Sequence, residues 1–349
     1  MESLFKNFSE KWLGTVNSTV QASIDAKNYL YKSMLRPLYS VDMTFSSISG
    51  KNSNVTADVV SMDSDLPLKS RGTIVSYSGE IPKVGMQKYQ GERQLKEIQV
   101  LQALNKPESQ LAARIFDDYN ACYVGATDKV EYMFQQALST GVIEIGQDVN
   151  TGRSIRVDFG IPGANKFTVG KLWSDPTSNP IEDLDKIKEA ADAAGVSSGF
   201  VLMDQVTFNY FKKNDNVVAL YGTAGLPSLT LDKTNEVLQA NFNLQIRIVN
   251  TSFKIEKDGV VTNVKAWAAG QVSFFSSLDN VGDLVYSDLA EKIATVPTKV
   301  YSYPEAWLQL TMEREGKPLR EFTESQGLVM PVLNNVDQIF LLDTLTATV

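Results

Sequence analysis

The feature that most constrains the fold is one long stretch, from Glu108 to Ser139, that carries a helical pattern and no proline. Pro107 precedes it in the position of a first-turn proline, and Gly141 follows it as a C-terminal stop. A helix of about thirty residues spans about 45 Å, so we expect a structural spine. The apolar residues that recur at three to four positions are Leu111, Ile115, Tyr119, Cys122, Ala126, Val130, Met133, Phe134, Ala137 and Leu138.

Two further regions have clear local signals. After the helix, Ile155, Val157 and Phe159 alternate with charged residues, which predicts a hairpin that turns at Asn150-Thr151-Gly152. From Asp175 onward, helices and strands alternate, which predicts a compact α/β domain of about 100 residues. Its signals are the N-cap Asn179 with Pro180, a helix that ends at Gly195, the strand GFVLM, a helix capped by Asp204, the helix DKTNEVLQA, the strand LQIRIVN and a hairpin at Asp258-Gly259.

The first fifty residues indicate an arm with two apolar pieces. One is an amphipathic helix in which Leu4, Phe5, Phe8, Trp12 and Leu13 share a face; the other is YLYKSMLRPLY, residues 29–39. Both could dock on the chain's own core or on a neighbouring copy, and the sequence leaves the two options open.

Residues 51–94 are too polar to form a core of their own. Two short runs, Thr73–Tyr77 and Lys83–Val84, predict an extended two-stranded hairpin that projects from the body and needs a surface to lie on, because isolated hairpins are marginal in water. A flexible surface loop is the alternative. Basic residues are scattered through the segment: Lys69, Arg71, Lys83, Lys88 and Arg93.

Composition excludes several functional classes. The chain has 349 residues, 43% of them hydrophobic, which is enough for two or three soluble domains. It lacks an apolar run of the roughly 18 residues that cross a bilayer, and a signal-peptide core. One cysteine and no histidine exclude an intrachain disulfide, multi-Cys/His zinc sites and histidine-based triads, and a reducing cytoplasm fits best. The net charge of −8 argues against tight phosphate-driven binding of nucleic acid.

Motifs for chemistry are weak. GIPGANKF, residues 160–167, has the wrong spacing for a phosphate loop and ends in Phe167 where a hydroxyl is needed. The neighbouring acids Asp117-Asp118 and Glu182-Asp183 diverge on a helix and cannot share a metal. Cys122 lies on the apolar stripe, which favours a buried inert thiol. We therefore predict no catalytic, cofactor-binding or metal residue and no enzyme; a soluble metal-dependent enzyme stays as a remote alternative.

The stretch from Tyr301 to Pro331 is the most specific motif. It runs Tyr303-Pro304, Trp307, Gly316-x-Pro318, Arg320-Glu321-Phe322-Thr323 and Gln326. This order of residues resembles the C-terminal signature of the lambda-type major capsid proteins of tailed bacteriophages, the capsid E family. LKSRG at 68–72, VDFG at 157–160 and DPTSNPIEDL at 175–184 extend the resemblance from about residue 65 to the end. The signature residues are Tyr303, Pro304, Trp307, Pro318, Arg320, Glu321, Phe322 and Gln326, with Gly316, Thr323 and an apolar strand at 327–330.

The resemblance implies an α+β fold of the Hong Kong 97 type. Its parts would be an N-terminal arm (1–50), an extended E-loop (51–95), a peripheral domain with the spine helix and hairpin (96–174), an axial α/β domain (175–280) and a return to the peripheral domain with C-terminal strands (281–349).

The implied function is self-assembly through hexamers and pentamers into an icosahedral head shell around double-stranded DNA. The protein would be made in the bacterial host cytoplasm and reside in the virion; an encapsulin-type nanocompartment is the alternative. Expected partners are other copies, a scaffolding protein, a portal, a decoration protein and DNA held non-specifically on the inner face, without cofactor or membrane. The candidate contacts between copies are Phe5, Phe8, Trp12, Lys69, Arg71, Lys83, Lys88 and Arg93.

Covalent crosslinking between copies has little support. Some capsids of this fold join lysine to asparagine, and Lys83 or Lys88 with Asn334 or Asn335 are of the right types, but no glutamate follows Asn335. The sequence does not predict shell size, maturation state or host.

Overall fold

The structure is a computed structural model that describes residues 18, 20–50, 74–103, 108–146, 154–220 and 230–347. The chain forms two compact units. The first contains residues 1–45, 79–134 and 283–331, and the second contains 46–78, 135–282 and 332–349. Among the described residues, no helix is both long and apolar enough to cross a membrane.

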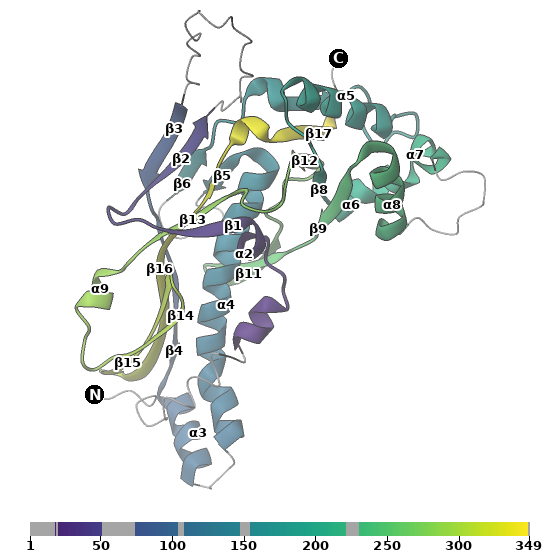
Figure 1. The fold of residues 1–349 in the computed structure, drawn as a ribbon. Helices are drawn as coiled ribbons and strands as arrows, with labels where there is room; N and C mark the ends of the chain where they lie inside the picture. The colour runs from purple at the N-terminus through teal and green to yellow at the C-terminus, as the bar shows by residue number, and fades with distance from the viewer. Residues whose placement is uncertain are drawn as a thin grey trace, which may run out of the picture. The chain divides into compact units, whose positions relative to one another are not determined.

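The first unit is built on a six-stranded sheet and the long helix α4 (Glu108–Thr140) (Figure 1). The sheet order is β1-β13-β16-β15-β14, and β4 pairs with β16 beside this path. Three shorter helices accompany it: α2 (Leu30–Met34), α3 (Glu92–Ala103) and α9 (Ala290–Ile293). The strands are β1 (Leu35–Tyr39), β4 (Lys83–Gln90), β13 (Gly282–Ser287), β14 (Val300–Glu305), β15 (Leu308–Gly316) and β16 (Leu319–Leu333).

Helix α4 confirms the predicted spine. It ends where Gly141 takes φ +75, a left-handed conformation that a residue without Cβ adopts at little cost. The predicted apolar stripe is buried from Tyr119 onward, and the same face explains why the helix packs along its length instead of standing free. Its fully buried members include Cys122, Val130, Met133 and Phe134.

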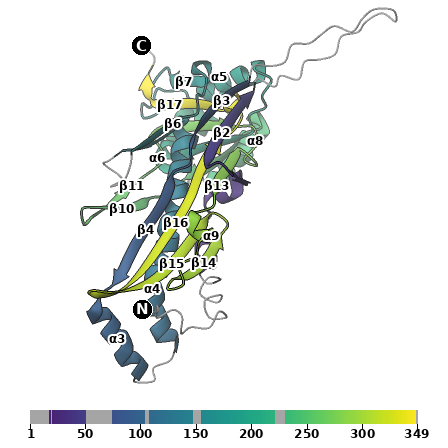
Figure 2. The ribbon, with the colours of Figure 1, turned by 90° about the vertical axis from the view of Figure 1, so that its left-hand side faces the viewer.

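The predicted hairpin between Thr73–Tyr77 and Lys83–Val84 is wrong. The strand β3 (Ile74–Glu80) pairs with β2 (Thr44–Gly50), whereas β4 pairs antiparallel with β16. Only Ile81 and Pro82 separate β3 from β4, and a residue before proline favours extended backbone, so the chain continues instead of turning back. Figure 2 shows β4 running beside β16.

Helix α3 was not predicted. It begins at Glu92, inside the segment expected to be a projecting loop, and its first turn is capped by a bond from the Gly91 N–H to Gln94 Oε1 (2.8 Å). Leu95 and Ile98, which follow the segment 51–94 that was expected to form no core of its own, are buried.

The second unit contains a mixed five-stranded sheet with the order β7-β17-β12-β8-β9. Its strands β7 (Lys166–Val169) and β17 (Phe340–Ala347) pair in parallel, although they are far apart in sequence. The other strands are β8 (Phe200–Asp204), β9 (Gln245–Val249) and β12 (Gln271–Phe275). The helices are α5 (Pro180–Ala193), α6 (Gln205–Lys213), α7 (Asp215–Ala219) and α8 (Leu231–Phe242), with the short 3₁₀ helices η2 (Gly163–Asn165) and η3 (Val336–Gln338).

Local signals in the second unit are confirmed. Asp204 caps α6 by accepting from the N–H groups of Val206 and Thr207. The hairpin of β10 (Phe253–Lys257) and β11 (Val260–Val264) turns at Asp258-Gly259, both with positive φ. The pair β5 (Val142–Ile145) and β6 (Ile155–Asp158) forms as expected, with its turn outside the described residues. The core gathers Leu184, Ile187, Val201, Phe211, Leu238, Ile246, Phe274 and Phe340.

Candidate functional site

The candidate site is the place where β4 meets the signature strand β16, and we call it the β4–β16 seam (residues 83–90 and 321–328). The register pairs Lys83 with Leu328 and Gln90 with Glu321. Two groups of predicted residues that lie more than 200 positions apart therefore come together: the basic residues of β4 and the signature residues of β16.

An aromatic contact anchors one end of the seam. The Tyr89 and Phe322 rings, directly opposite each other, have centroids 5.8 Å apart. The Arg320 guanidinium lies over the Tyr89 ring, 4.9 Å from its centroid. Contacts of this kind contribute roughly 0.5–1 kcal/mol each at exposed sites. Two signature residues thus hold the side chain of a residue that the sequence reasoning had not selected.

Close backbone approach fixes the middle of the seam. A Cβ on Gly85 would lie 2.3 Å from the Ser325 carbonyl oxygen, so a residue with a side chain would displace β4. Next to it, the Met86 sulfur occupies the space over Gly125 of α4. The strand is therefore held against both β16 and α4.

Polar contacts complete the seam. Gln87 donates through Nε2 to Glu324 Oε1 (2.6 Å), and Lys88 Nζ lies 4.0 Å from Asp118 Oδ1 on α4. Lys83 is exposed and lines a shallow hollow of about 490 Å³ with Gln326. Within the chain itself, Lys88 already has an acidic partner, which is the type of contact that the sequence assigned to a neighbouring copy.

The signature strands also pack on α4. The Cys122 thiol donates to the Thr323 carbonyl (3.4 Å), and the Tyr119 and Ser302 hydroxyls share a hydrogen bond of 2.9 Å. Burial raises the pKa of the Cys122 thiol to about 12. Cys122 is fully buried, as predicted, and its thiol contacts the signature strand β16; its inertness stays a prediction.

Glu321 forms the most deeply buried ion pair of the signature. Its carboxylate accepts from Arg314 Nε (2.8 Å), and its side chain is 2% exposed against 18% for Arg314. The two residues face each other across the β15–β16 hairpin, whose turn contains Pro318. The guanidinium offsets the cost of burying the Glu321 charge, so the hairpin depends on keeping both members of the pair.

The remaining signature residues have separate roles. Trp307 is buried, and its ring and carbonyl lie so close to Gly327 that a Cβ there would be 2.5 Å from the carbonyl oxygen. Tyr303 is exposed and stacks on Tyr301 with centroids 6.5 Å apart, while Lys292 Nζ lies 5.8 Å from its centroid. Pro304 lies in β14, and Gln326 donates to Glu324 (3.1 Å).

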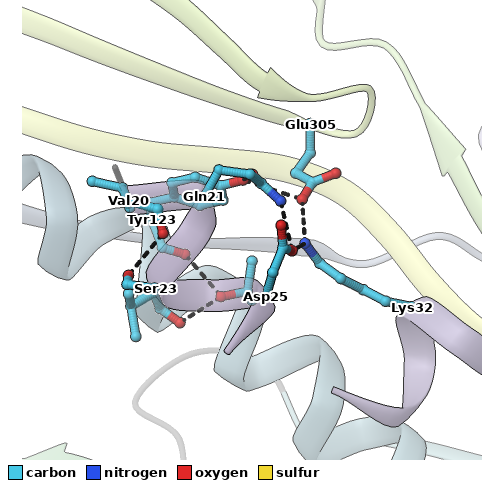
Figure 3. A network of polar contacts seen from close by, with 9 residues as sticks. Val20, Gln21, Ser23, Asp25, Lys32, Tyr123 and Glu305 are labelled. Atoms are coloured by element: carbon cyan, nitrogen blue, oxygen red, sulfur yellow. Dashed lines mark hydrogen bonds and ion pairs between the residues drawn. The ribbon is translucent and has the colours of Figure 1, made fainter. Parts of the chain in front are cut away.

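A second cluster, the arm network, ties residues 20–34 to α4 and β14 (Figure 3). The Tyr123 hydroxyl bonds to Glu305 (3.1 Å) and to Gln21, and Lys32 Nζ bridges Glu305 (2.9 Å) and Asp25 (3.1 Å).

Buried contacts reinforce the arm network. The Tyr29 hydroxyl donates to Asp128, and the Tyr31 N–H donates to Glu131 Oε2 (3.0 Å). Burial raises the pKa of both tyrosines. With Leu30 and Met34 buried, the apolar piece that begins at Tyr29 docks on its own chain, one of the two options that the sequence left open.

Several predicted residues are not part of these clusters. Phe5, Phe8, Trp12, Lys69 and Arg71 lie outside the described residues. Arg93 pairs with Glu97 on the exposed face of α3 (3.6 Å). The sequence reasoning missed Tyr89, Met86, Gly125, Lys32 and Glu305, whose partners are distant in the chain, so no local pattern singles them out.

Among the described residues, acidic side chains are not grouped as metal ligands would be. In the part of the chain that the structure describes, no cluster of three potential ligands is present. Glu182 pairs with Lys186 (2.8 Å), a hydrogen bond that lowers the carboxyl pKa, whereas Asp183 accepts from Trp173 Nε1 (2.9 Å) and burial raises its pKa. The two carboxylates are thus committed to different partners, as the sequence predicted.

Comparisons with known proteins give separate evidence on the family and the fold. The chain matches the model of the family described as phage major capsid protein E over residues 15–339. No curated protein sequence matches significantly.

Two solved structures have the same fold at low sequence identity. A phage-related protein from Bordetella bronchiseptica RB50 is 13% identical, with 96% of this chain and 98% of that chain covered and a TM-score of 0.54. A putative capsid protein of a prophage from E. coli CFT073 is 15% identical, with 90% and 92% covered and a TM-score of 0.55. The chain therefore belongs to the phage major capsid protein E family and is a major capsid protein of tailed phages with the Hong Kong 97-type fold.

Proposed function

We propose that copies of this chain assemble through hexamers and pentamers into the icosahedral head shell that encloses the double-stranded DNA of a tailed phage. As a major capsid protein, the chain is a component of the virion and associates with itself. The phage family match does not favour the nanocompartment alternative. The protein acts by assembly and not by catalysis, since its side-chain clusters hold strands in place.

The β4–β16 seam carries the proposal. A strand that leaves the predicted E-loop is held on a signature strand by the Tyr89–Phe322 and Arg320–Tyr89 contacts. A shell protein needs its projecting segments held at a defined angle, because the same contact is repeated around a closed shell and each weak contact is multiplied. On this proposal the parts are the arm (1–50), E-loop (51–95), peripheral domain (96–174 and 281–349) and axial domain (175–280).

Contacts between copies are proposed for the basic residues of the E-loop region. Lys83 is exposed, Lys88 is 45% exposed at its side chain despite its distant partner Asp118, and Arg93 is 95% exposed at its side chain. Lys69 and Arg71 are proposed by the same charge argument, and Phe5, Phe8 and Trp12 by their apolar pattern. A scaffolding protein, a portal, a decoration protein and non-specifically held DNA are the proposed further partners.

The test is negative-stain microscopy with light scattering of the full chain, alone and with a candidate scaffolding protein. We expect closed shells, tubes or isolated hexamers and pentamers. A monodisperse monomer under both conditions would contradict assembly.

A variant links assembly to the seam. Tyr89→Ala removes the ring that Arg320 and Phe322 hold, so we expect a lower yield of closed shells with the subunit still folded. Val218→Ala on α7 truncates an exposed apolar side chain elsewhere and serves as the matched control, with unchanged yield. Equal yields of closed shells for the two variants would show that the Tyr89 contacts of the seam do not support assembly.

A further inference from the structure

The second unit contains a hollow that the shell function does not yet explain, and we call it the α6 groove. It has a volume of about 840 Å³ and lies between α6, the end of α4, β5, β6, the loop before β12 and β17. Three large apolar side chains at its wall are strongly exposed: Val206 (48%), Tyr210 (39%) and Leu345 (49%). Val206 and Tyr210 are four residues apart on α6 and therefore share one face.

The groove is built on fixed backbone. The Asp204 cap holds the first turn of α6, and the Trp267 indole N–H donates to the Gln271 carbonyl (3.0 Å). Leu345 packs on Gly270, where a Cβ would lie 2.3 Å from Leu345 Cγ. A preformed hollow of this kind loses little entropy when a ligand enters it.

The chemistry of the lining favours an amphipathic chain segment. The interior is apolar, with Trp267 and Ala266 as the buried floor. Apart from Asp204, the charged residues of the lining are exposed: Arg156 and Glu144 form a pair (3.0 Å), and the third is Lys265. Asp204, the buried carboxylate, is already used as a helix cap. Helices that bind in grooves present apolar anchors three, four and seven residues apart, with charges facing outward.

The sequence of residues 1–17, which precedes the arm network, has this pattern. Phe5, Phe8 and Trp12 are spaced by three, four and seven positions. Charges of both signs occupy other positions of the segment: Glu2, Lys6, Glu10 and Lys11. The arm network anchors the chain directly after this segment, so the point from which the segment extends is fixed. Seventeen residues reach about 25 Å as a helix and up to about 60 Å when extended, so the segment can project well beyond its anchor.

We propose that the α6 groove of one copy binds the aromatic side chains of the N-terminal segment, residues 1–17, of a second copy. The inference rests on the proposed shell, in which copies lie side by side and a head-to-tail contact between unlike surfaces closes into a ring. Anchoring raises the effective concentration of the segment, so an individually weak contact is sufficient.

Site-directed crosslinking of full-length chains tests the proposal. Cys122 is the chain's one cysteine and is buried, so introduced cysteines report without interference. Trp12→Cys and Val206→Cys chains are mixed, assembled and oxidised. The expected result is a two-chain species on a non-reducing gel, in which mass spectrometry identifies the Trp12→Cys peptide joined to the Val206→Cys peptide.

The matched control replaces Val206→Cys with Val260→Cys. Val260 is 62% exposed on the β10–β11 hairpin of the same unit and does not line the groove, so we expect at least a tenfold lower yield of mixed species.

Each of the other outcomes overturns a defined part of the proposal. Shells that form with equal or no crosslinking in the two mixtures overturn the groove proposal and leave the shell function intact. A disulfide that forms only within a chain carrying both Trp12→Cys and Val206→Cys would show that the segment binds the groove of its own chain. That result would overturn the contact between copies. Absence of both shells and crosslinks overturns the shell function together with the groove.

Discussion

At the residue scale, burial separates ion pairs that look alike in sequence. Arg314–Glu321 and Arg156–Glu144 both join facing residues of antiparallel strands, at 2.8 and 3.0 Å. The Glu321 side chain is 2% exposed, whereas both partners of the second pair exceed 60%. Water screens the second pair and not the first, so removing one arginine should cost much more stability at the first pair than at the second.

We predict that Arg314→Ala lowers the free energy of unfolding by about 3 kcal/mol, because it removes the guanidinium that offsets the cost of burying the Glu321 charge. Arg156→Ala is the matched control, with an expected change below about 1 kcal/mol. Denaturant unfolding of the unassembled chain measures both. Similar losses for the two variants would contradict a special role for the buried pair.

Cys122 provides a second prediction at this scale. Its pKa is raised to about 12 by burial, so the native thiol stays protonated and should resist alkylation at pH 8, while the denatured chain reacts fully. The raised pKa favours the protonated form in the folded state. Its contribution to stability is therefore complete below the unfolded value of about 8.5 and is lost as the pH rises toward about 12. Rapid alkylation of the native chain, followed by mass spectrometry, would disprove the assigned burial.

At the scale of elements, glycines determine where helices stop. Gly141 ends α4 with φ +75, and Gly195 follows α5 with φ +72. The two conformations are alike, but the surroundings differ. A Cβ on Gly141 would lie 2.6 Å from Ile161 Cδ1, while no atom within 4 Å would meet one on Gly195.

We predict that Gly195→Ala costs about 1 kcal/mol, the penalty of a left-handed residue with a side chain. Gly141→Ala should cost about 1–3 kcal/mol more, since Ile161 must also move. Thermal unfolding of the two variants measures the difference. If Gly141→Ala lowers stability no more than Gly195→Ala does, Ile161 can move aside and its packing at the end of α4 does not exclude a side chain at position 141.

At the scale of the whole molecule, copies that carry a net charge of −8 repel one another. We predict that assembly becomes faster and more complete when salt rises from about 0.01 M to about 0.1 M, where the Debye length falls from about 30 to about 10 Å. Light scattering of the full chain measures this. Slower assembly with salt would instead show that attractive ion pairs, such as those proposed for Lys83 and Arg93, dominate the contacts.

Prediction from sequence succeeded where neighbours in the chain determine the outcome. The spine helix, the Asp204 cap and the Asp258-Gly259 turn depend on residues within a few positions, so periodicity and backbone preference were sufficient. The order of residues from Tyr303 to Gln326 likewise carried the family.

The tertiary structure alone decided which distant segments meet. Three contacts illustrate this: β4 pairs with β16 instead of β3, Met86 packs on Gly125, and Lys32 forms an ion pair with Glu305. The residues that they join lie between 39 positions (Met86 and Gly125) and 273 positions (Lys32 and Glu305) apart in the sequence. Any of several strands could satisfy the backbone bonds of β4. The choice among them depends on side-chain packing and burial between remote segments, which local sequence preferences do not encode.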